Sequence, residues 1–163
     1  MKTVFVDTSG FYACLDQADS FHPRALAAFE RAEKENWTLF TTNYVVHETW
    51  ALIQRRLGWE AVETFLNDLL PRCAVIWADE NLYHAASNRC RRTRERRFSL
   101  TDAISLECMA RQKITEAIAK TNILPAKMSC CHDRAQSDPA KVDARTVPGK
   151  LRDAIARLFS PYL

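Results

Sequence analysis

The sequence is short of glycine and proline, and it has no long apolar run. Among 163 residues there are 3 glycines and 6 prolines, which excludes a collagen-like repeat and a low-complexity chain. No apolar run approaches the roughly 20 residues that span a bilayer. Asp7 also interrupts the first strand-like run, residues 3–6, before it could form a signal-peptide core. We therefore expect a cytoplasmic protein that does not bind a membrane.

An excess of charge of either sign is also missing. The 23 Lys and Arg residues nearly balance the 20 Asp and Glu residues, and the net charge of +3 is too small to indicate a polyanionic partner by itself. The hydrophobic content of 47% is sufficient for one compact domain with a complete core. Any nucleic-acid site must therefore come from local clustering of charge.

The 6 cysteines lack the spacing of a disulfide framework or a zinc site. Four of them occur singly in apolar segments, where free Cys behaves as a small buried hydrophobe: Cys14, Cys73, Cys90 and Cys108. Residues 130–132 (CCH) are the one cluster, but adjacent residues lack the two-to-four-residue spacing that lets ligands converge on tetrahedral zinc. This cysteine usage indicates a reducing compartment and disfavours a zinc site.

Strand-like and helix-like segments alternate along residues 1–119. Short β-branched or aromatic runs predict strands at residues 3–6, 37–41, 73–77 and 113–119. Apolar residues at three- to four-residue intervals predict helices between them, the last covering residues 100–111. Strands alternating with helices indicate βαβ units, and hence an α/β fold with a mostly parallel sheet covered on both faces.

The pattern changes after Lys120. Residues 125–150 contain three prolines and Gly149 and show neither period, so an irregular or disordered tail is expected. Residues 151–163 carry apolar side chains at i, i+4, i+7 and i+8, which predict an amphipathic terminal helix. The predicted organisation is therefore a domain at 1–124, a tail at 125–150 and a helix at 151–163.

Asp7 comes directly after the first predicted strand. In doubly wound sheets, ligand sites form beyond the carboxyl ends of the strands, which makes Asp7 a candidate functional acid. Alternatively, Asp7 is a turn or helix-cap residue, because Asp is common at such junctions. The residue pattern leaves both interpretations open.

Glu48 lies on the predicted helical face of Val45, Thr49 and Leu52. A carboxylate on an apolar face is costly to bury unless it pairs with a cation or a metal. Alternatively, the Glu48 side chain reaches solvent at the margin of the face or pairs with an arginine. His47 points elsewhere on the helix and is expected to be an ordinary surface or rim residue.

Asp102 follows Ser99 at the spacing of a capping box, in which each side chain accepts from the other residue's backbone N–H. The same position places Asp102 in the first turn of a helix. There the positive helix N-terminus favours an ionised carboxylate that can bind a divalent ion. The structural and functional roles are compatible.

Six arginines fall between Arg89 and Arg97. Guanidinium groups pair with phosphate oxygens, so this density predicts an RNA-binding surface formed by Arg91, Arg92, Arg94, Arg96 and Arg97. The alternative is a solvated helix face without a ligand.

Three segments together resemble the acidic motifs of PIN-domain ribonucleases, most closely those of VapC-type toxins of bacterial toxin–antitoxin pairs. They are residues 4–10 (VFVDTSG), 43–48 (NYVVHE) and 98–105 (FSLTDAIS). The resemblance implies a three-layer α/β/α sandwich in which Asp7, Glu48 and Asp102 bind Mg²⁺ or Mn²⁺ for RNA hydrolysis. Ser9 and Thr101 would support these acids or contact a phosphate. A cognate antitoxin and a homodimer are also implied.

The resemblance covers about residues 1–119 and ends there. Family members usually have a fourth Asp or Asn after the strand that corresponds to residues 113–119. Here Asn122 is the candidate near that position, as a weak ligand, because an amide binds a hard cation less well than a carboxylate does. One hypothesis is that the family-like sequence has been replaced beyond residue 119, which would weaken or abolish activity.

The sequence therefore predicts a metal-dependent endoribonuclease that is the toxin of a toxin–antitoxin pair. A second hypothesis is a catalytically degenerate PIN-fold protein that binds RNA or antitoxin without cleavage. A third, a haloacid-dehalogenase-like phosphotransferase, requires a second Asp two residues after the first, where this chain has Ser9. That third hypothesis is accordingly disfavoured.

Overall fold

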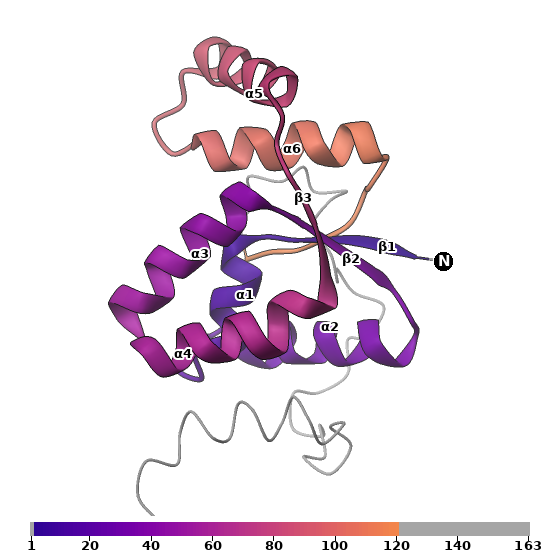
Figure 1. The fold of residues 1–163 in the computed structure, drawn as a ribbon, viewed down its shortest axis with the longest axis vertical. Helices are drawn as coiled ribbons and strands as arrows, with labels where there is room; N and C mark the ends of the chain where they lie inside the picture. Colours follow the sequence, from indigo (N-terminus) through magenta and orange to yellow (C-terminus); the bar gives the residue numbers. More distant parts are fainter. Residues whose placement is uncertain (1, 121–163) are drawn as a thin grey trace, which may run out of the picture.

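The computed structural model describes residues 2–120 (Figure 1). The predicted tail, the predicted terminal helix and Asn122 lie outside the described residues. In chain order the elements are β1 (Thr3–Val6), α1 (Thr8–Leu15), α2 (His22–Lys34), β2 (Thr38–Thr42), α3 (Asn43–Arg56), α4 (Trp59–Thr64), the π-helical turn η1 (Phe65–Leu69), the 3₁₀ turn η2 (Leu70–Arg72), β3 (Cys73–Ile76), α5 (Glu80–Thr93), α6 (Leu100–Gln112) and β4 (Ala117–Ile118). Within residues 2–120, no helix is long and apolar enough to cross a membrane.

The four strands form one sheet in the order β3-β2-β1-β4, and every neighbouring pair is parallel. In the central register Phe5 of β1 lies opposite Phe40 of β2 and Ala117 of β4. Parallel pairing places the carboxyl ends of the strands along the same edge of the sheet. The predicted α/β class with a parallel sheet is thus confirmed.

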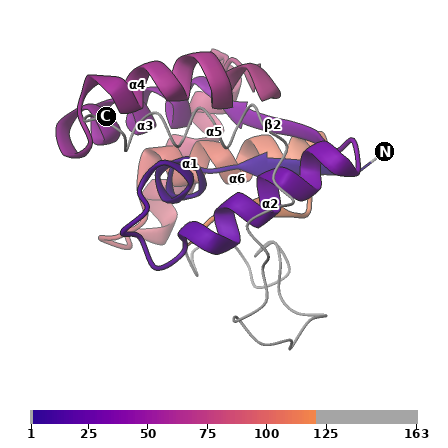
Figure 2. The ribbon, with the colours of Figure 1, turned by 90° about the horizontal axis from the view of Figure 1, so that it is seen from below.

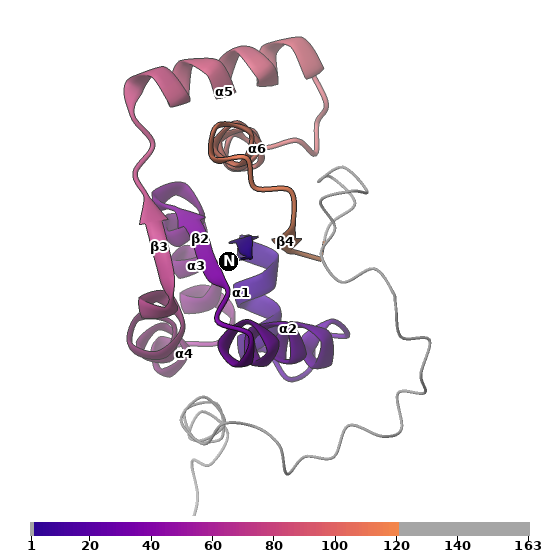
Figure 3. The ribbon, with the colours of Figure 1, turned by 90° about the vertical axis from the view of Figure 1, so that its right-hand side faces the viewer.

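The helices cover the sheet in layers. Figure 3 shows α5 outermost, α6 between α5 and the sheet, and α2 and α4 beyond the opposite face. Seen from below in Figure 2, α1, α2 and α4 lie in front and α5 and α6 lie behind. Helix α3 begins directly after β2 and contacts both α1 and α6. It therefore lies at the carboxyl end of β2 and connects the helices of the two layers. The arrangement is the expected three-layer sandwich.

The core holds α1 firmly beneath the sheet. The fully buried ring of Phe11 on α1 packs against Phe29 on α2, with ring centroids 6.0 Å apart, and edge-on against Phe65, with centroids 5.1 Å apart. Such tilted and edge-to-face aromatic contacts add to the free energy gained by burial. The first turn of α1, which follows Asp7, is therefore held in a defined position.

The fourth strand is shorter than the sequence predicted. Instead of covering residues 113–119, β4 consists of Ala117–Ile118. Lys113 adopts a left-handed φ of 56°, and the N–H of Ile114 donates to the carbonyl of Met109 at 2.9 Å. The residues just after α6 therefore end that helix rather than extend the sheet.

Candidate active site

Asp7 occupies the junction between β1 and α1 and is a buried acid, 8% exposed. Its Oδ2 accepts from the Ser9 hydroxyl at 2.9 Å and from the Ser9 backbone N–H at 3.3 Å. The second of these bonds caps α1. The cap interpretation is thus confirmed, and it leaves Oδ1 available for another partner.

The pKa of the Asp7 carboxyl is raised above its ordinary value. Burial is the main cause, the hydrogen bonds from Ser9 oppose it, and the negative charges of Asp102 and Glu48 raise the pKa further. Ionised Asp7 therefore lies in the repulsive field of two other carboxylates. This is a position that a bound cation would stabilise.

Glu48 is brought to the site by α3, whose N-terminus is capped by Thr42 through a 3.3 Å bond from the Val45 N–H. Its Oε2 accepts from the Thr8 hydroxyl at 2.6 Å. No Lys, Arg or His among residues 2–120 forms an ion pair with Glu48. Its partner is thus a hydroxyl from α1, which the sequence did not predict.

Asp102 forms the predicted capping box at the start of α6. Its Oδ2 accepts from the Ser99 N–H and from the Ser99 hydroxyl, both at 2.8 Å, and its own N–H donates to Ser99 Oγ at 3.0 Å. The box holds the carboxylate in the first turn of the helix, next to the positive end of the helix dipole.

The three acids line one hollow of about 860 Å³ at the carboxyl edge of the sheet. Ser9 and Thr101 also line this hollow, which we call the acidic hollow. It is the place where β1 ends, where α3 closes the strand ends and where α6 begins. The structure thus brings together five residues that were predicted to bind the metal or to support the acids.

Each acid uses one oxygen for the contacts described above. Within residues 2–120, Asp7 Oδ1, Glu48 Oε1 and Asp102 Oδ1 accept no hydrogen bond. The described residues contain no group of three or more His, Cys, Asp or Glu arranged to hold a metal ion together. The unbonded carboxylate oxygens of Asp7, Glu48 and Asp102 nevertheless suit Mg²⁺. This ion takes hard oxygen ligands, keeps several waters and needs only one or two carboxylates from the protein.

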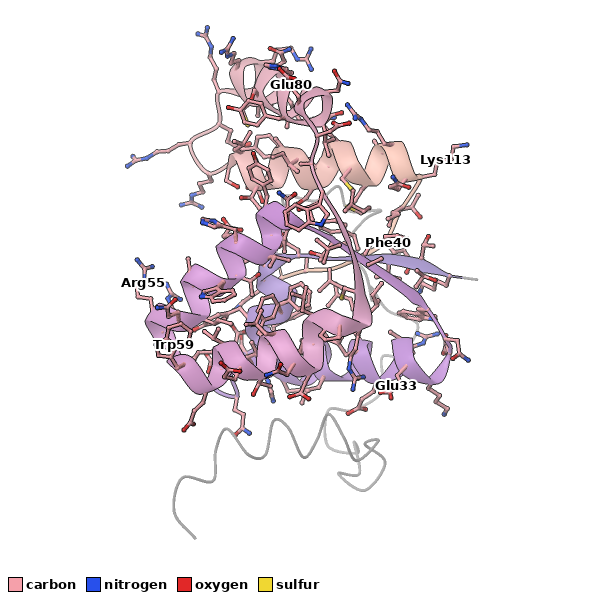
Figure 4. All side chains as sticks on the ribbon, viewed as in Figure 1. Glu33, Phe40, Arg55, Trp59, Glu80 and Lys113 are labelled. Carbon is pink, nitrogen blue, oxygen red and sulfur yellow. The ribbon has the colours of Figure 1, made fainter. Side chains whose placement is uncertain are left out.

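A rim of positive charge surrounds the acids. Arg55, Arg56, Arg97 and Lys120 line the acidic hollow. In Figure 4, nitrogen-tipped side chains extend from the loop between α5 and α6 on the same side of the molecule as the labelled Arg55. Such a rim suits a phosphate chain that approaches the acids.

The predicted arginine surface reaches the hollow through one member only. Arg97 lines it, whereas the other predicted residues are exposed and do not: Arg91, Arg92, Arg94 and Arg96. Helix α5 ends at Thr93 and Arg94 turns the chain with a left-handed φ of 50°. This turn reverses the chain toward α6 and brings the later part of the loop to the site.

Arg55 was not predicted from the sequence, although a signal was present. Glu48, Ala51, Leu52 and Arg55 are spaced i, i+3, i+4 and i+7 on one helix face, and all four line the hollow. His47 also lines it and is exposed, as expected for a rim residue. No local pattern pointed to Lys120.

A second hollow, of about 400 Å³, lies between α2 and the turns before β3. Its lining includes Phe29, Trp37 and Arg72, and the Arg72 guanidinium is paired with Glu33 at 2.8 Å. This hollow lacks the three converging acids, so we place the candidate active site in the larger one.

We expect the stability difference between the wild type and Asp7→Asn to depend on pH. Because the folded-state pKa of Asp7 is raised above the value of 3.8 for an unperturbed Asp, ionised Asp7 destabilises the fold at neutral pH. That penalty is relieved as the pH falls through the raised pKa, and Asp7→Asn lacks this titration. Urea unfolding of both proteins is measured without divalent ions at values from about pH 7 down to about pH 4.5. The difference between their free energies of unfolding should become smaller as the pH falls. A difference in the free energy of unfolding that stays constant over this pH range would contradict the raised pKa of Asp7.

The PIN domain family model matches residues 4–122, which include all three acids. Six chains among the solved structures also match. One is a crystal structure of Mycobacterium tuberculosis VapC20, described as a Sarcin-Ricin loop cleaving toxin. It is 30% identical with a TM-score of 0.63, over 73% of this chain and 90% of that one. No curated protein matches significantly.

Proposed function

Because the chain belongs to the PIN domain family, as a VapC-type member, we propose that it is a metal-dependent endoribonuclease and the toxin of a toxin–antitoxin pair. The observation that carries the proposal is the convergence of Asp7, Glu48 and Asp102 on one hollow with a basic rim. Clustered carboxylates favour a cation, and the surrounding arginines favour phosphate. Together these features suit hydrolysis of an RNA phosphodiester bond.

The three acids would hold Mg²⁺ or Mn²⁺ through their remaining oxygens. When bound, such an ion activates a water molecule and neutralises charge on the phosphate during hydrolysis. The Ser9 and Thr8 hydroxyls keep one oxygen of Asp7 and of Glu48 engaged, which orients the other oxygen. Thr101 precedes Asp102 and also lines the hollow, so its hydroxyl would contact a phosphate oxygen.

Arg55 and Arg97 would bind the RNA backbone at the rim of the acidic hollow. They come from two different segments that line it, α3 and the loop before α6. Their forked guanidinium groups match phosphate oxygens in geometry and charge. In this arrangement they hold the scissile phosphate against the carboxylates.

The family relationship supports further proposals about partners. We propose that a cognate antitoxin masks the acidic hollow, that the protein is a homodimer and that it acts in the cytoplasm. Masking by the antitoxin is tested by coexpressing the two proteins and measuring whether RNA competes with the antitoxin for binding. The homodimer is tested by measuring the mass of the isolated protein in solution.

The function is tested by incubating purified, antitoxin-free protein with a pool of cellular RNA and with a Sarcin-Ricin loop hairpin. The hairpin is included because the similar VapC20 is described as cleaving that loop. We expect fragments with Mg²⁺ or Mn²⁺ and none with EDTA. Intact RNA after incubation with folded protein would favour the alternative of a PIN-fold protein that binds RNA or antitoxin without cleavage.

We expect Arg97→Gln to weaken RNA binding more than Arg91→Gln. Arg97 lines the acidic hollow and Arg91 does not, so removing the Arg97 charge should cost about tenfold in affinity and lower the salt dependence by about one phosphate contact. Fluorescence anisotropy with a labelled RNA measures both, in an Asp7→Asn background that keeps the RNA intact. Equal losses for the two variants would instead indicate that the whole arginine loop binds RNA.

A further inference from the structure

Lys120 ties the end of β4 to two other segments. Its backbone N–H donates to Ser9 Oγ at 2.9 Å. Its ammonium group donates to both carboxylate oxygens of Asp19, at 2.8 Å to Oδ1 and 3.0 Å to Oδ2. One residue therefore joins the first turn of α1, the turn between α1 and α2, and the end of the sheet.

The contact with Ser9 continues to Asp7. Because Ser9 Oγ accepts from Lys120, its single proton is directed to Asp7 Oδ2, 2.9 Å away. The chain of bonds runs from the Lys120 backbone through Ser9 to Asp7. It engages Oδ2 and leaves Oδ1 for the acidic hollow.

Asp19 is the fixed end of the ion pair. Its side chain is 9% exposed, against 45% for Lys120, and its Oδ1 also accepts from the Phe21 N–H at 2.8 Å. Burial by itself raises the pKa of Asp19, but the bonds from Lys120 and Phe21 outweigh burial and the pKa lies below its ordinary value. Asp19 is therefore an ionised anchor that restrains the lysine.

We propose that Asp19 and Lys120 are positioning residues for Asp7. Their ion pair holds the end of β4 in place, and the Lys120 N–H then sets the direction of the Ser9 hydrogen bond that orients the Asp7 carboxylate. The inference rests on the proposed function to the extent that Asp7 binds a divalent ion. Neither residue needs to touch the ion or the RNA for this role.

The charge of Lys120 provides a way to separate positioning from simple electrostatics. An ammonium group near an acidic site opposes the binding of a cation, so removing it tightens cation binding if charge alone matters. If Lys120 positions Asp7, its removal weakens cation binding instead. The sign of the effect therefore discriminates between the two explanations.

The test measures Mn²⁺ affinity of the full chain by calorimetry for Lys120→Met, Asp19→Asn, the double variant and Lys120→Arg. We expect each single substitution to weaken binding about three- to tenfold, as loss of a supporting hydrogen-bond partner typically does. The double variant should be no weaker than the single variants, because both break the same link. Lys120→Arg keeps the ion pair and should restore affinity.

Lys2→Met is the matched control. It removes another Lys–carboxylate pair next to β4, between Lys2 and Glu116 at 2.7 Å, but at the opposite end of the strands. We expect its Mn²⁺ affinity to equal that of the wild type. Tighter or unchanged binding by Lys120→Met would overturn the inference.

Hydrogen exchange of the Lys120 amide in the metal-free protein gives an independent readout. We expect Asp19→Asn to speed this exchange about tenfold and Lys2→Met to leave it unchanged. Unchanged exchange in Asp19→Asn would overturn the positioning role. Failure of the wild type to bind Mn²⁺ would instead count against the proposed metal site, and the exchange data would still decide the inference.

Discussion

Asp7→Asn removes metal-dependent RNA cleavage while the protein stays folded and gains stability. The substitution replaces a hard anionic ligand by a neutral amide, so we expect the cleavage rate to fall about a hundredfold or more. It also removes a buried charge that Glu48 and Asp102 repel, which should raise the free energy of unfolding by about 1 kcal/mol. The amide oxygen can still accept from the Ser9 N–H and cap α1. Initial rates on cellular RNA and urea unfolding measure the two effects.

Asp79→Asn is the matched control for this experiment. Asp79 also caps a helix, because its Oδ1 accepts from the Leu82 N–H at 2.7 Å, but it is exposed and does not line the acidic hollow. We expect its cleavage rate to equal that of the wild type. Full activity of Asp7→Asn, or an equal loss in Asp79→Asn, would contradict the assigned role of Asp7.

Gly10→Ala destabilises the protein strongly, although glycine to alanine in a helix ordinarily stabilises. A Cβ on Gly10 would overlap the backbone carbonyl oxygen of Ile118 and would lie 3.1 Å from the Ile118 Cγ2. Since backbone cannot move aside as a flexible side chain can, α1 or β4 must shift. We expect a loss of about 2–4 kcal/mol in the free energy of unfolding, measured by urea denaturation.

Gly58→Ala provides the comparison for the steric effect. Gly58 has a φ of 90°, which an L residue rarely adopts, but a Cβ there has no neighbouring atom within 4 Å. Backbone strain alone should cost about 1 kcal/mol, less than the overlap at Gly10. Wild-type stability of Gly10→Ala would show that β4 does not pack as closely on α1 as described. Such close packing also brings Lys120 to Ser9.

Local interactions explain why the element types and several caps could be predicted. The Asp7 cap on α1 and the capping box of Ser99 and Asp102 depend on residues at most three positions apart. The same range of interaction explains the error at β4, since the C-terminal cap of α6 occupies Lys113 and Ile114, at the start of the predicted strand. A strand pattern alone does not reveal where the preceding helix stops.

The acids were identified from three sequence motifs, and Ser9 and Ser99 were predicted as neighbours of two of them, but the partners distant in sequence were not predicted. The Thr8 hydroxyl bonds to Glu48 across 40 positions of the chain, and Lys120 bonds to Ser9 across 111. Among the arginines, density in the sequence suggested five, of which Arg97 lines the hollow and four do not, whereas the helix face of Glu48 places Arg55 there as well. Contacts between distant segments follow from packing, which composition does not encode.

The sequence by itself determined the alternation of strands and helices, the α/β class and the three candidate acids. Periodicity and capping depend on residues a few positions apart, so they can be recognised in the amino-acid sequence. Only the tertiary structure decided the strand order β3-β2-β1-β4, which sets β4 beside β1. That order brings Lys120 to Ser9 and Asp19, because contacts across the sheet depend on which strands are neighbours and not on how close they are in sequence.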